Sequence, residues 1–302
     1  MTLYTLAEKN VRRTWLLMSV FLIFIIGLGW LFSHLLNDSI FLVIAFIVAI
    51  LQSFLSYWYS DKIVLIMTRA KPIERSENPE LYRIVENLCI TAGLPLPKIY
   101  VLNENQPNAF ATGRDEKHAI VAVTRGLLEK LDRTELEGVI AHELSHIGNK
   151  DTLLQTVVVV LVGIIAMVSN FFLRISFWSR PRRREEGSGE DRSAAIFAIF
   201  GIIAAILAPI VATLIQLAIS RKREFLADAT GALLTRYPEG LALALEKISQ
   251  DTNLLRVANN STAHLYIVSP FRGKEAQSWL TKLFSTHPPV EERIAALRQL
   301  KI

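Results

Sequence analysis

Cysteine is almost absent from the sequence, since Cys89 is the only one among 302 residues. An intramolecular disulfide is therefore excluded, and a lone cysteine is compatible with a reducing compartment. Cys89 lies in the apolar run 84–90, and this context predicts a buried thiol on a helix.

The sequence also lacks runs of mixed basic and aromatic residues of the kind that form RNA-binding strands. Its net charge of +5 at pH 7 therefore gives no reason to expect a nucleic-acid partner. Hydrophobic residues, in contrast, make up 51% of the chain, and the mean hydropathy is +0.34. This composition is too apolar for a soluble domain of this length. It indicates a membrane protein with a soluble part, so the lipid bilayer is an expected partner.

Four long apolar runs divide the chain. Residues 15–36 and 40–58 are each long enough to cross a bilayer, which takes about 20 residues in a helix. Residues 153–173 and 194–219 contain polar interruptions and Pro209, so they could be two further spans or a hairpin at the membrane surface. We expect four hydrophobic membrane helices, with a charged loop over residues 174–192 between the last two.

Basic residues flank the first two runs on the sides away from their connection. They are Lys9, Arg12 and Arg13 before the first run, and Lys62, Arg69, Lys71 and Arg75 after the second. The connection between the two runs carries only Asp38 and His34. The positive-inside rule then predicts that the N-terminus and the chain after Tyr59 are cytoplasmic.

Residues 79–134 have the pattern of a soluble α/β segment. Helical periodicity over residues 80–92 ends at Gly93, and three strands are expected at 98–102, 108–113 and 119–124. Residues 109–112 could form an edge strand to which a substrate peptide adds, or an ordinary core strand. The expected fold class is α+β and mainly α: a soluble domain with a small sheet, joined to the membrane helices.

The sequence from His142 to His146 reads H-E-x-x-H. Residues four apart share one face of a helix, so His142 and His146 can direct two imidazole nitrogens at one tetrahedral zinc. Glu143 lies about 100° round the same helix, where it can act as a general base without binding the metal. A capping box formed by Thr134 and Glu137 is expected to begin this helix. The alternative is a chance match on a surface helix.

A catalytic zinc needs one more protein ligand, because such sites use three together with water. After the fourth apolar run, Glu224 and Asp228 lie four residues apart on a predicted helix. Glu224 can face the zinc, and Asp228 can accept the other N–H of a ligand histidine. The alternative is that Glu224 is a surface acid paired with a residue such as Arg221.

Four stretches together resemble the HtpX-type membrane metalloproteases of the M48 peptidase class: residues 108–113, 141–146, 220–228 and 286–294. The resemblance runs nearly end to end and implies a zincin-like protease domain. It implies one zinc ion per chain, bound by His142, His146 and Glu224, with Glu143 as the catalytic base. It also implies an ATP-independent endopeptidase of the bacterial inner membrane, acting under stress in quality control of membrane proteins.

The resemblance further suggests that His287 and Arg293 approach the cleft, where they could stabilise the oxyanion of the tetrahedral intermediate. The alternative is a helix-entry cap, with an ion pair to Glu291 or Glu292. The residues expected to bind substrate are Asn108, Ala109, Phe110 and Ala111.

The expected organisation has four parts. They are two transmembrane helices (1–60), the first part of the protease domain (61–152), a membrane hairpin (153–219), and the second part of the protease domain (220–302). Both metal-binding stretches adjoin the hairpin. We therefore expect the zinc just above the cytoplasmic membrane face, acting on membrane proteins or their juxtamembrane loops.

Two other functions fit the membrane segments. A scaffold or chaperone-like protein with a structural zinc is one, although structural sites usually have four protein ligands. A transporter is the other, although few ionisable residues lie inside the apolar runs. The oligomeric state is not indicated. Residues 174–192 or 259–271 could cover the cleft and restrain the protease.

Overall fold

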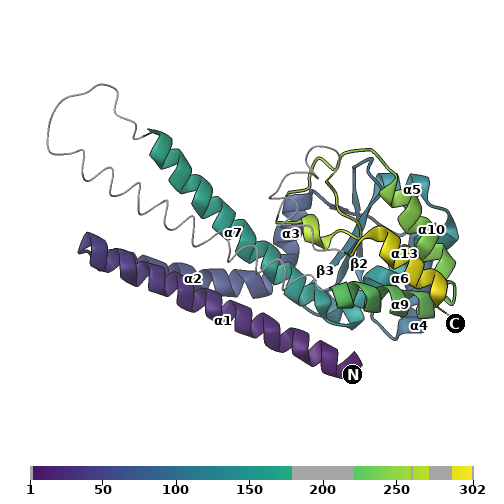
Figure 1. Cartoon of the computed structure of the whole chain (residues 1–302), viewed down its shortest axis with the longest axis horizontal. Coiled ribbons are helices and arrows are strands. Elements are labelled where there is room, and N and C mark those ends of the chain that lie inside the picture. The colour runs from purple at the N-terminus through teal and green to yellow at the C-terminus, as the bar shows by residue number, and fades with distance from the viewer. Residues whose placement is uncertain (1–2, 179–220, 260, 272–287, 301–302) are drawn as a thin grey trace.

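The structure, a computed structural model, describes residues 3–178, 221–259, 261–271 and 288–300. Three long helices extend from one side of a unit built from shorter helices and a small sheet (Figure 1). The elements in chain order are α1 (Leu3–Leu36), α2 (Ile40–Trp58), α3 (Ser60–Thr68), β1 (Lys71–Pro72), α4 (Pro79–Ala92), β2 (Lys98–Leu102), β3 (Ala109–Thr112), η1 (Glu116–His118), β4 (Ile120–Thr124), α5 (Arg125–Lys130), α6 (Arg133–Gly148), α7 (Asp151–Trp178), α9 (Arg221–Thr235), α10 (Pro238–Ser249), η2 (Ala263–Leu265) and α13 (Val290–Gln299).

Helices α1 and α2 carry the candidate membrane spans found among the described residues. These are Glu8–His34 and Ile40–Trp58, each with a mean hydropathy of 2.4. Large apolar side chains on α2 are about half exposed, for example Phe46 at 52% and Ile47 at 58%. A continuous apolar surface of this kind is suited to lipid rather than to water. The first two predicted spans are therefore found, and the second has the predicted bounds.

Of the four expected membrane helices, two are found as candidate spans among the described residues, and not four. The third run is helical as part of α7, and the side chains of its first portion, up to Gly163, are described. Its side chains are buried against α1 and the soluble unit, so this stretch packs against protein. The fourth run, 194–219, and most of the loop 174–192 lie outside the described residues.

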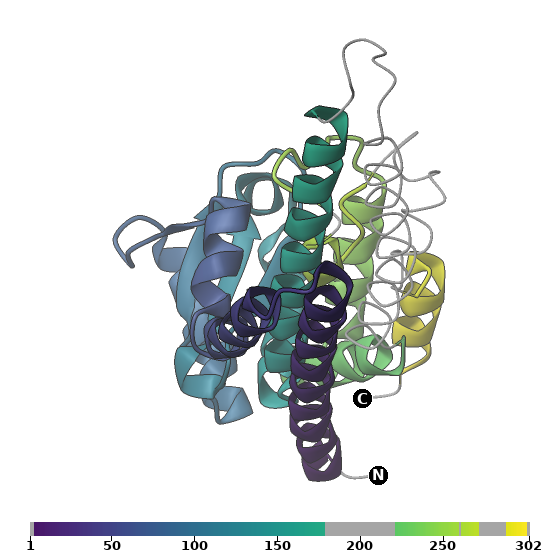
Figure 2. The same cartoon turned by 90° about the vertical axis from the view of Figure 1, so that its left-hand side faces the viewer.

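An apolar interface joins α1 to the first half of α7, and both helices stand before the sheet in Figure 2. Leu17, Met18 and Phe21 of α1 pack with residues of α7 such as Leu154 and Val158. All five side chains are buried. The first membrane helix is thus fixed directly to the helix that follows the H-E-x-x-H motif.

The sheet contains four strands in the order β1-β2-β4-β3. Strands β2 and β4 are parallel, whereas β3 runs antiparallel to β4 and β1 antiparallel to β2. The three predicted strands are confirmed to within one residue at each end, and β1 is an addition of two residues. Because β3 is an edge strand, the prediction of an edge over residues 109–112 is also confirmed.

Helix α6 lies at the centre of the soluble unit, between the sheet, α4, α9 and α10. The predicted apolar face is buried: Leu136, Val139, Ile140, Leu144 and Ile147. The helix is therefore a core element, and the alternative of a surface helix is wrong.

Helix α6 begins two residues earlier than predicted. Its N-cap is Asp132, whose side chain accepts the backbone N–H of Glu135 at 2.9 Å. The Glu135 side chain in turn accepts the Asp132 backbone N–H, which completes the capping box. Thr134 instead lies in the first turn and donates its hydroxyl to Asp132. Aspartate is at least as good an N-cap as threonine, and here it is the residue placed before the first turn.

Candidate active site

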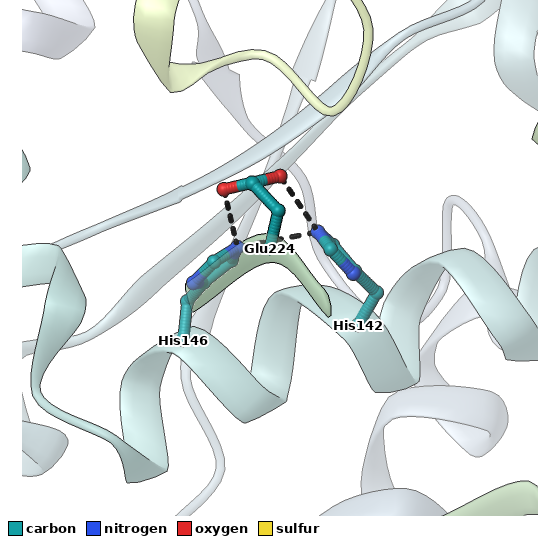
Figure 3. Close-up of side chains that lie close together, drawn as sticks. All are labelled: His142, His146 and Glu224. Carbon is teal, nitrogen blue, oxygen red and sulfur yellow. Dashed lines mark hydrogen bonds and ion pairs between the residues drawn. The ribbon is translucent and has the colours of Figure 1, made fainter. Parts of the chain in front are cut away.

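The two histidines of α6 point their Nε2 atoms at each other across one face of the helix (Figure 3). The distance between these atoms is 3.2 Å, and the rings are nearly perpendicular, at 89°. Both side chains are buried. The i, i+4 spacing therefore produces the convergence that the sequence predicted.

Glu224 on α9 reaches the same point, although it follows His146 by 78 residues in the chain. Its Oε2 lies 3.9 Å from His142 Nε2, and its Oε1 lies 3.6 Å from His146 Nε2. One ligand atom from each of the three residues lies within 4.8 Å of the others. Glu224 is 1% exposed, so the alternative of a surface acid is wrong.

A carboxylate holds the other nitrogen of each histidine. Asp228 Oδ1 lies 2.9 Å from His142 Nδ1, as the sequence predicted, and Asp151 Oδ2 lies 3.0 Å from His146 Nδ1. Donation of each Nδ1–H to its carboxylate leaves the lone pair of each Nε2 directed into the space beside Glu224. Sequence analysis missed Asp151. Its position five residues after His146 was the available signal, but an acid in the first turn of a helix is commonplace.

This arrangement fits a zinc ion. Two unprotonated Nε2 atoms facing each other at 3.2 Å repel unless a cation lies between them. Ligands at Zn–N and Zn–O distances near 2.0–2.1 Å in a tetrahedron are separated by roughly 3.3–3.5 Å, close to the separations of these three side chains. Two histidine nitrogens and one carboxylate also form a known catalytic zinc set.

The buried charges around the histidines favour a divalent cation. Four carboxylates are opposed by two guanidinium groups, which leaves two negative charges when both histidines are neutral: Glu143, Asp151, Glu224 and Asp228 against Arg223 and Arg293. Burial alone would lower the pKa of His146, but Asp151 and Glu224 raise it to about 9. The site therefore attracts positive charge to the space between the rings.

Glu143 lies on α6 between the two histidines in sequence and is 1% exposed. Its Oε1 has no hydrogen-bond partner among the described residues. Burial raises the pKa of Glu143 to about 7, and the neighbouring charge of Glu224 acts in the same direction. The backbone of Ala111 is directed at this carboxylate and acts in the opposite direction. Glu143 thus lies beside the edge strand, with an oxygen available to a reacting group.

The outward backbone groups of β3 border the site. Residues 108, 110 and 112 face β4, which leaves those of Ala109 and Ala111 on the free edge. The Ala109 carbonyl accepts the N–H of Ile267 at 3.0 Å, and the Asn108 amide donates to the Val268 carbonyl at 2.9 Å. Phe110 packs edge-on against the ring of Tyr266. Part of this edge is thus covered by residues 266–268.

Arg293 projects from α13 into the site and is 1% exposed. Its guanidinium makes two hydrogen bonds to Asp228, at 2.8 and 2.7 Å, and one to the Ile267 carbonyl at 2.7 Å. Burial would raise the pKa of Asp228, but Arg293 lowers it to about 2. The alternative of an ion pair between Arg293 and a neighbouring acid of its own helix is not what these contacts show. His287 lies outside the described residues.

Comparison with known proteins agrees with this geometry. The model of the family described as Peptidase family M48 matches residues 75–301. A Protease HtpX homolog of Thermoanaerobacter pseudethanolicus is 46% identical over 302 residues, covering 99% of this chain and 98% of its own. A Protease HtpX homolog of Pyrococcus furiosus is 48% identical and covers 95% of each chain. The crystal structure of Ste24p from S. mikatae aligns with a TM-score of 0.48 and 20% identity over 94% of this chain and 66% of its own. The chain therefore belongs to peptidase family M48, as an HtpX-type metalloendopeptidase.

Proposed function

We propose that this membrane metalloprotease is a zinc-dependent endopeptidase that cleaves membrane proteins, including misfolded ones, on the cytoplasmic side of the bacterial inner membrane. The observation that carries the proposal is the convergence of His142, His146 and Glu224 at one buried point, with Glu143 beside it. Three protein ligands leave a coordination position open, as in catalytic zinc sites. A structural zinc in a scaffold or chaperone-like protein would usually be closed by a fourth ligand.

In this proposal His142, His146 and Glu224 hold the zinc, and Asp228 and Asp151 keep the two rings oriented. When bound, zinc supplies Lewis acidity that lowers the pKa of water and polarises a peptide carbonyl. Glu143 accepts a proton from the attacking water and returns it to the leaving amine. Its position supports this role, because it is buried beside the edge strand and its Oε1 has no hydrogen-bond partner among the described residues.

Arg293 is better placed as a positioning residue than as the oxyanion partner suggested by the sequence. Its hydrogen bonds go to Asp228 and to the Ile267 carbonyl, and its Nη1 lies 3.7 Å from Glu224 Oε2. It therefore neutralises the carboxylate that orients His142. The proposed contribution of His287 to oxyanion stabilisation stays a prediction.

The substrate is proposed to bind as an added strand at the free edge of β3. Ala109 and Ala111 would supply the backbone hydrogen bonds, and Asn108 and Phe110, the residues on either side of Ala109, would contribute to the same surface. Since Ala109 already accepts the N–H of Ile267, residues 266–268 must move before a long substrate can pair there. This contact supports the hypothesis that residues 259–271 restrain the protease.

The placement of α1 and α2 supports a substrate at the membrane. Both helices extend from the unit that contains the site, and the N-terminal end of α1 lies beside that unit (Figure 1). The basic residues around the first two spans support a cytoplasmic site by the positive-inside rule. Division of the protease domain into residues 61–152 and 220–302 by the segment 153–219 is part of the same proposal.

The test uses the full chain purified in detergent. We expect about one zinc per chain, casein cleavage that a chelator abolishes, and recovery of cleavage when zinc is restored. Substitution His146→Ala is expected to remove both zinc and cleavage. Purified protein that retains zinc after all treatments and never cleaves casein would favour the structural-zinc alternative.

A further inference from the structure

Asp151, which orients His146, is held from its other side by a residue of the first membrane helix. Asn10 of α1 donates its amide to Asp151 Oδ1 at 2.6 Å, while Asp151 Oδ2 lies 3.0 Å from His146 Nδ1. Asn10 and Asp151 are 4% and 1% exposed, and 141 residues of sequence separate them. A buried carboxylate with both oxygens engaged has its plane fixed, so it cannot rotate away from the imidazole.

The contacts of Asn10 extend to both helices that carry the metal-binding residues. Its amide also donates to the Asn149 carbonyl at 3.2 Å, in the connection between α6 and α7. Arg223 Nη1 lies 3.5 Å from Asn10 Oδ1, and Arg223 Nε lies 3.4 Å from Asp151 Oδ1. Arg223 directly precedes Glu224 on α9. The side-chain amide of Asn10 therefore contacts Asp151, which orients His146, and Arg223, the residue before Glu224.

The apolar interface of α1 with α7 begins two turns beyond Asn10, at Leu17. That interface fixes the position of α1 along α7, and Asn10 lies at the end of it nearest the metal site. Mere attachment of the helix could be achieved by apolar residues alone. A buried asparagine directed at a ligand-orienting carboxylate adds a specific electrostatic contact that apolar packing cannot supply.

We propose that Asn10 is a positioning residue for the metal site: it holds the Asp151 carboxylate against His146 and so couples the first membrane helix to zinc affinity. This inference rests on the proposed function, because it assumes that His146 binds zinc. A shift of α1 relative to α7 would withdraw the amide from Asp151. The membrane helix is thus part of the metal site as well as an anchor.

The test compares Asn10→Leu with Thr14→Val in the full chain in detergent. Thr14 lies one turn along α1 and is 1% exposed, but its hydroxyl bonds to the Asn10 carbonyl within its own helix. Zinc affinity is measured by competition with a chromogenic chelator, and folding by Tm. Loss of a group that directly orients a metal ligand typically weakens metal binding by about 10- to 100-fold. Because Asn10 acts through Asp151, we expect Asn10→Leu to weaken zinc binding by about 10-fold, at the lower end of that range. Thr14→Val should bind zinc like the wild type. Asn10→Gln, which keeps a side-chain amide, should have a zinc affinity between those of the wild type and Asn10→Leu.

Three results would decide against the inference. The first is an unchanged zinc affinity in Asn10→Leu. The second is a loss of zinc affinity and Tm in Thr14→Val as large as in Asn10→Leu, because both variants would then report only the packing of α1. Wild-type protein that binds no zinc would overturn the proposed function together with this inference. The wild type thus tests the proposed function, and the comparison of the two α1 variants tests the role of Asn10.

Discussion

The backbone of Gly231 on α9 lies against the backbone of His142 on α6. A Cβ atom at Gly231 would be 2.9 Å from the His142 nitrogen and 3.2 Å from its Cα. This close approach brings Glu224, two turns earlier on α9, to the two histidines. The absence of a side chain at Gly231 is therefore a condition for the three-residue metal site.

Substitution Gly231→Val is expected to separate α9 from α6 and to reduce zinc binding. Forcing a side chain into a packed contact costs about 1–3 kcal/mol, so a lower Tm should accompany the lost zinc. Zinc content after gel filtration and Tm measure the two effects. Gly163→Ala on α7 is the control, because a Cβ there meets nothing within 4 Å. A Gly231→Val protein with full zinc content would refute the argument.

Substitution Glu143→Gln is expected to preserve zinc while reducing casein cleavage by about 10²–10⁴-fold, the usual contribution of a general base. The amide keeps the shape of the side chain but cannot accept the proton. Glu137→Gln on the same helix is the matched control, because Glu137 only forms a surface ion pair with Arg133, at 3.0 Å. Normal cleavage by Glu143→Gln would exclude Glu143 as the base.

The parts of the site that the sequence predicted are those that local spacing determines. His142 and His146 converge because a helix places them one turn apart, and Asp228 lies one turn from Glu224 for the same reason. The prediction that these two helices contribute to one metal site rested on the resemblance to known metalloproteases. Asn10 and Asp151 could not be paired from the sequence, because their contact crosses 141 residues and depends on how α1 packs on α7.

The predicted fold differs from the structure at points where the sequence pattern allows more than one arrangement. Two overlapping capping patterns begin near residue 132, and only the structure shows that Asp132 precedes the first turn. The run 153–173 has the composition of a membrane span, but composition does not distinguish burial in lipid from burial in protein. The first half of α7, up to Ile165, is covered by α1 and the soluble unit.

Substitution Arg293→Met is expected to destabilise the protein by about 3–5 kcal/mol, because it leaves the buried charge of Asp228 without its positively charged partner. The double variant Arg293→Met with Asp228→Asn should recover part of this loss, since the charge of Asp228 is then removed together with that of Arg293. Thermal unfolding in detergent measures both. Arg298→Met on the same helix is the control, because its ion pairs with Glu239 and Glu246 are at the surface and contribute at most about 1 kcal/mol. A loss in Arg293→Met no larger than in Arg298→Met would contradict this account.

Cys89 should be unreactive in the folded protein. It is 3% exposed, and burial together with the charge of Glu86 raises its pKa to about 11. A thiol reagent at pH 8 is therefore expected to label the protein only after unfolding. Because the pKa of Cys89 is higher in the folded than in the unfolded protein, its protonated form favours folding. The contribution of Cys89 to the free energy of unfolding is fully present below pH 9, and about 3 kcal/mol of it is lost as the pH rises through 11. Cys89→Ala should lack this part of the decline, and an identical pH profile for wild type and variant would contradict the prediction.

Ile267 is hydrogen-bonded through its backbone N–H to the edge strand β3, at the Ala109 carbonyl. Substitution Ile267→Pro removes the N–H that the Ala109 carbonyl accepts, whereas Ile267→Ala keeps it and removes only the side chain beyond Cβ. If this hydrogen bond restrains substrate entry, the proline variant should cleave casein faster than the wild type, mainly through a lower KM, because the edge of β3 is then free to pair. Cleavage is measured at matched zinc content, so that indirect effects through Arg293, which donates to the Ile267 carbonyl, are separated. If Ile267→Ala accelerates cleavage equally, the side chain is responsible for the restraint and the hydrogen bond is not. If Ile267→Pro cleaves more slowly at full zinc content, residues 266–268 help to build the substrate site instead of covering it.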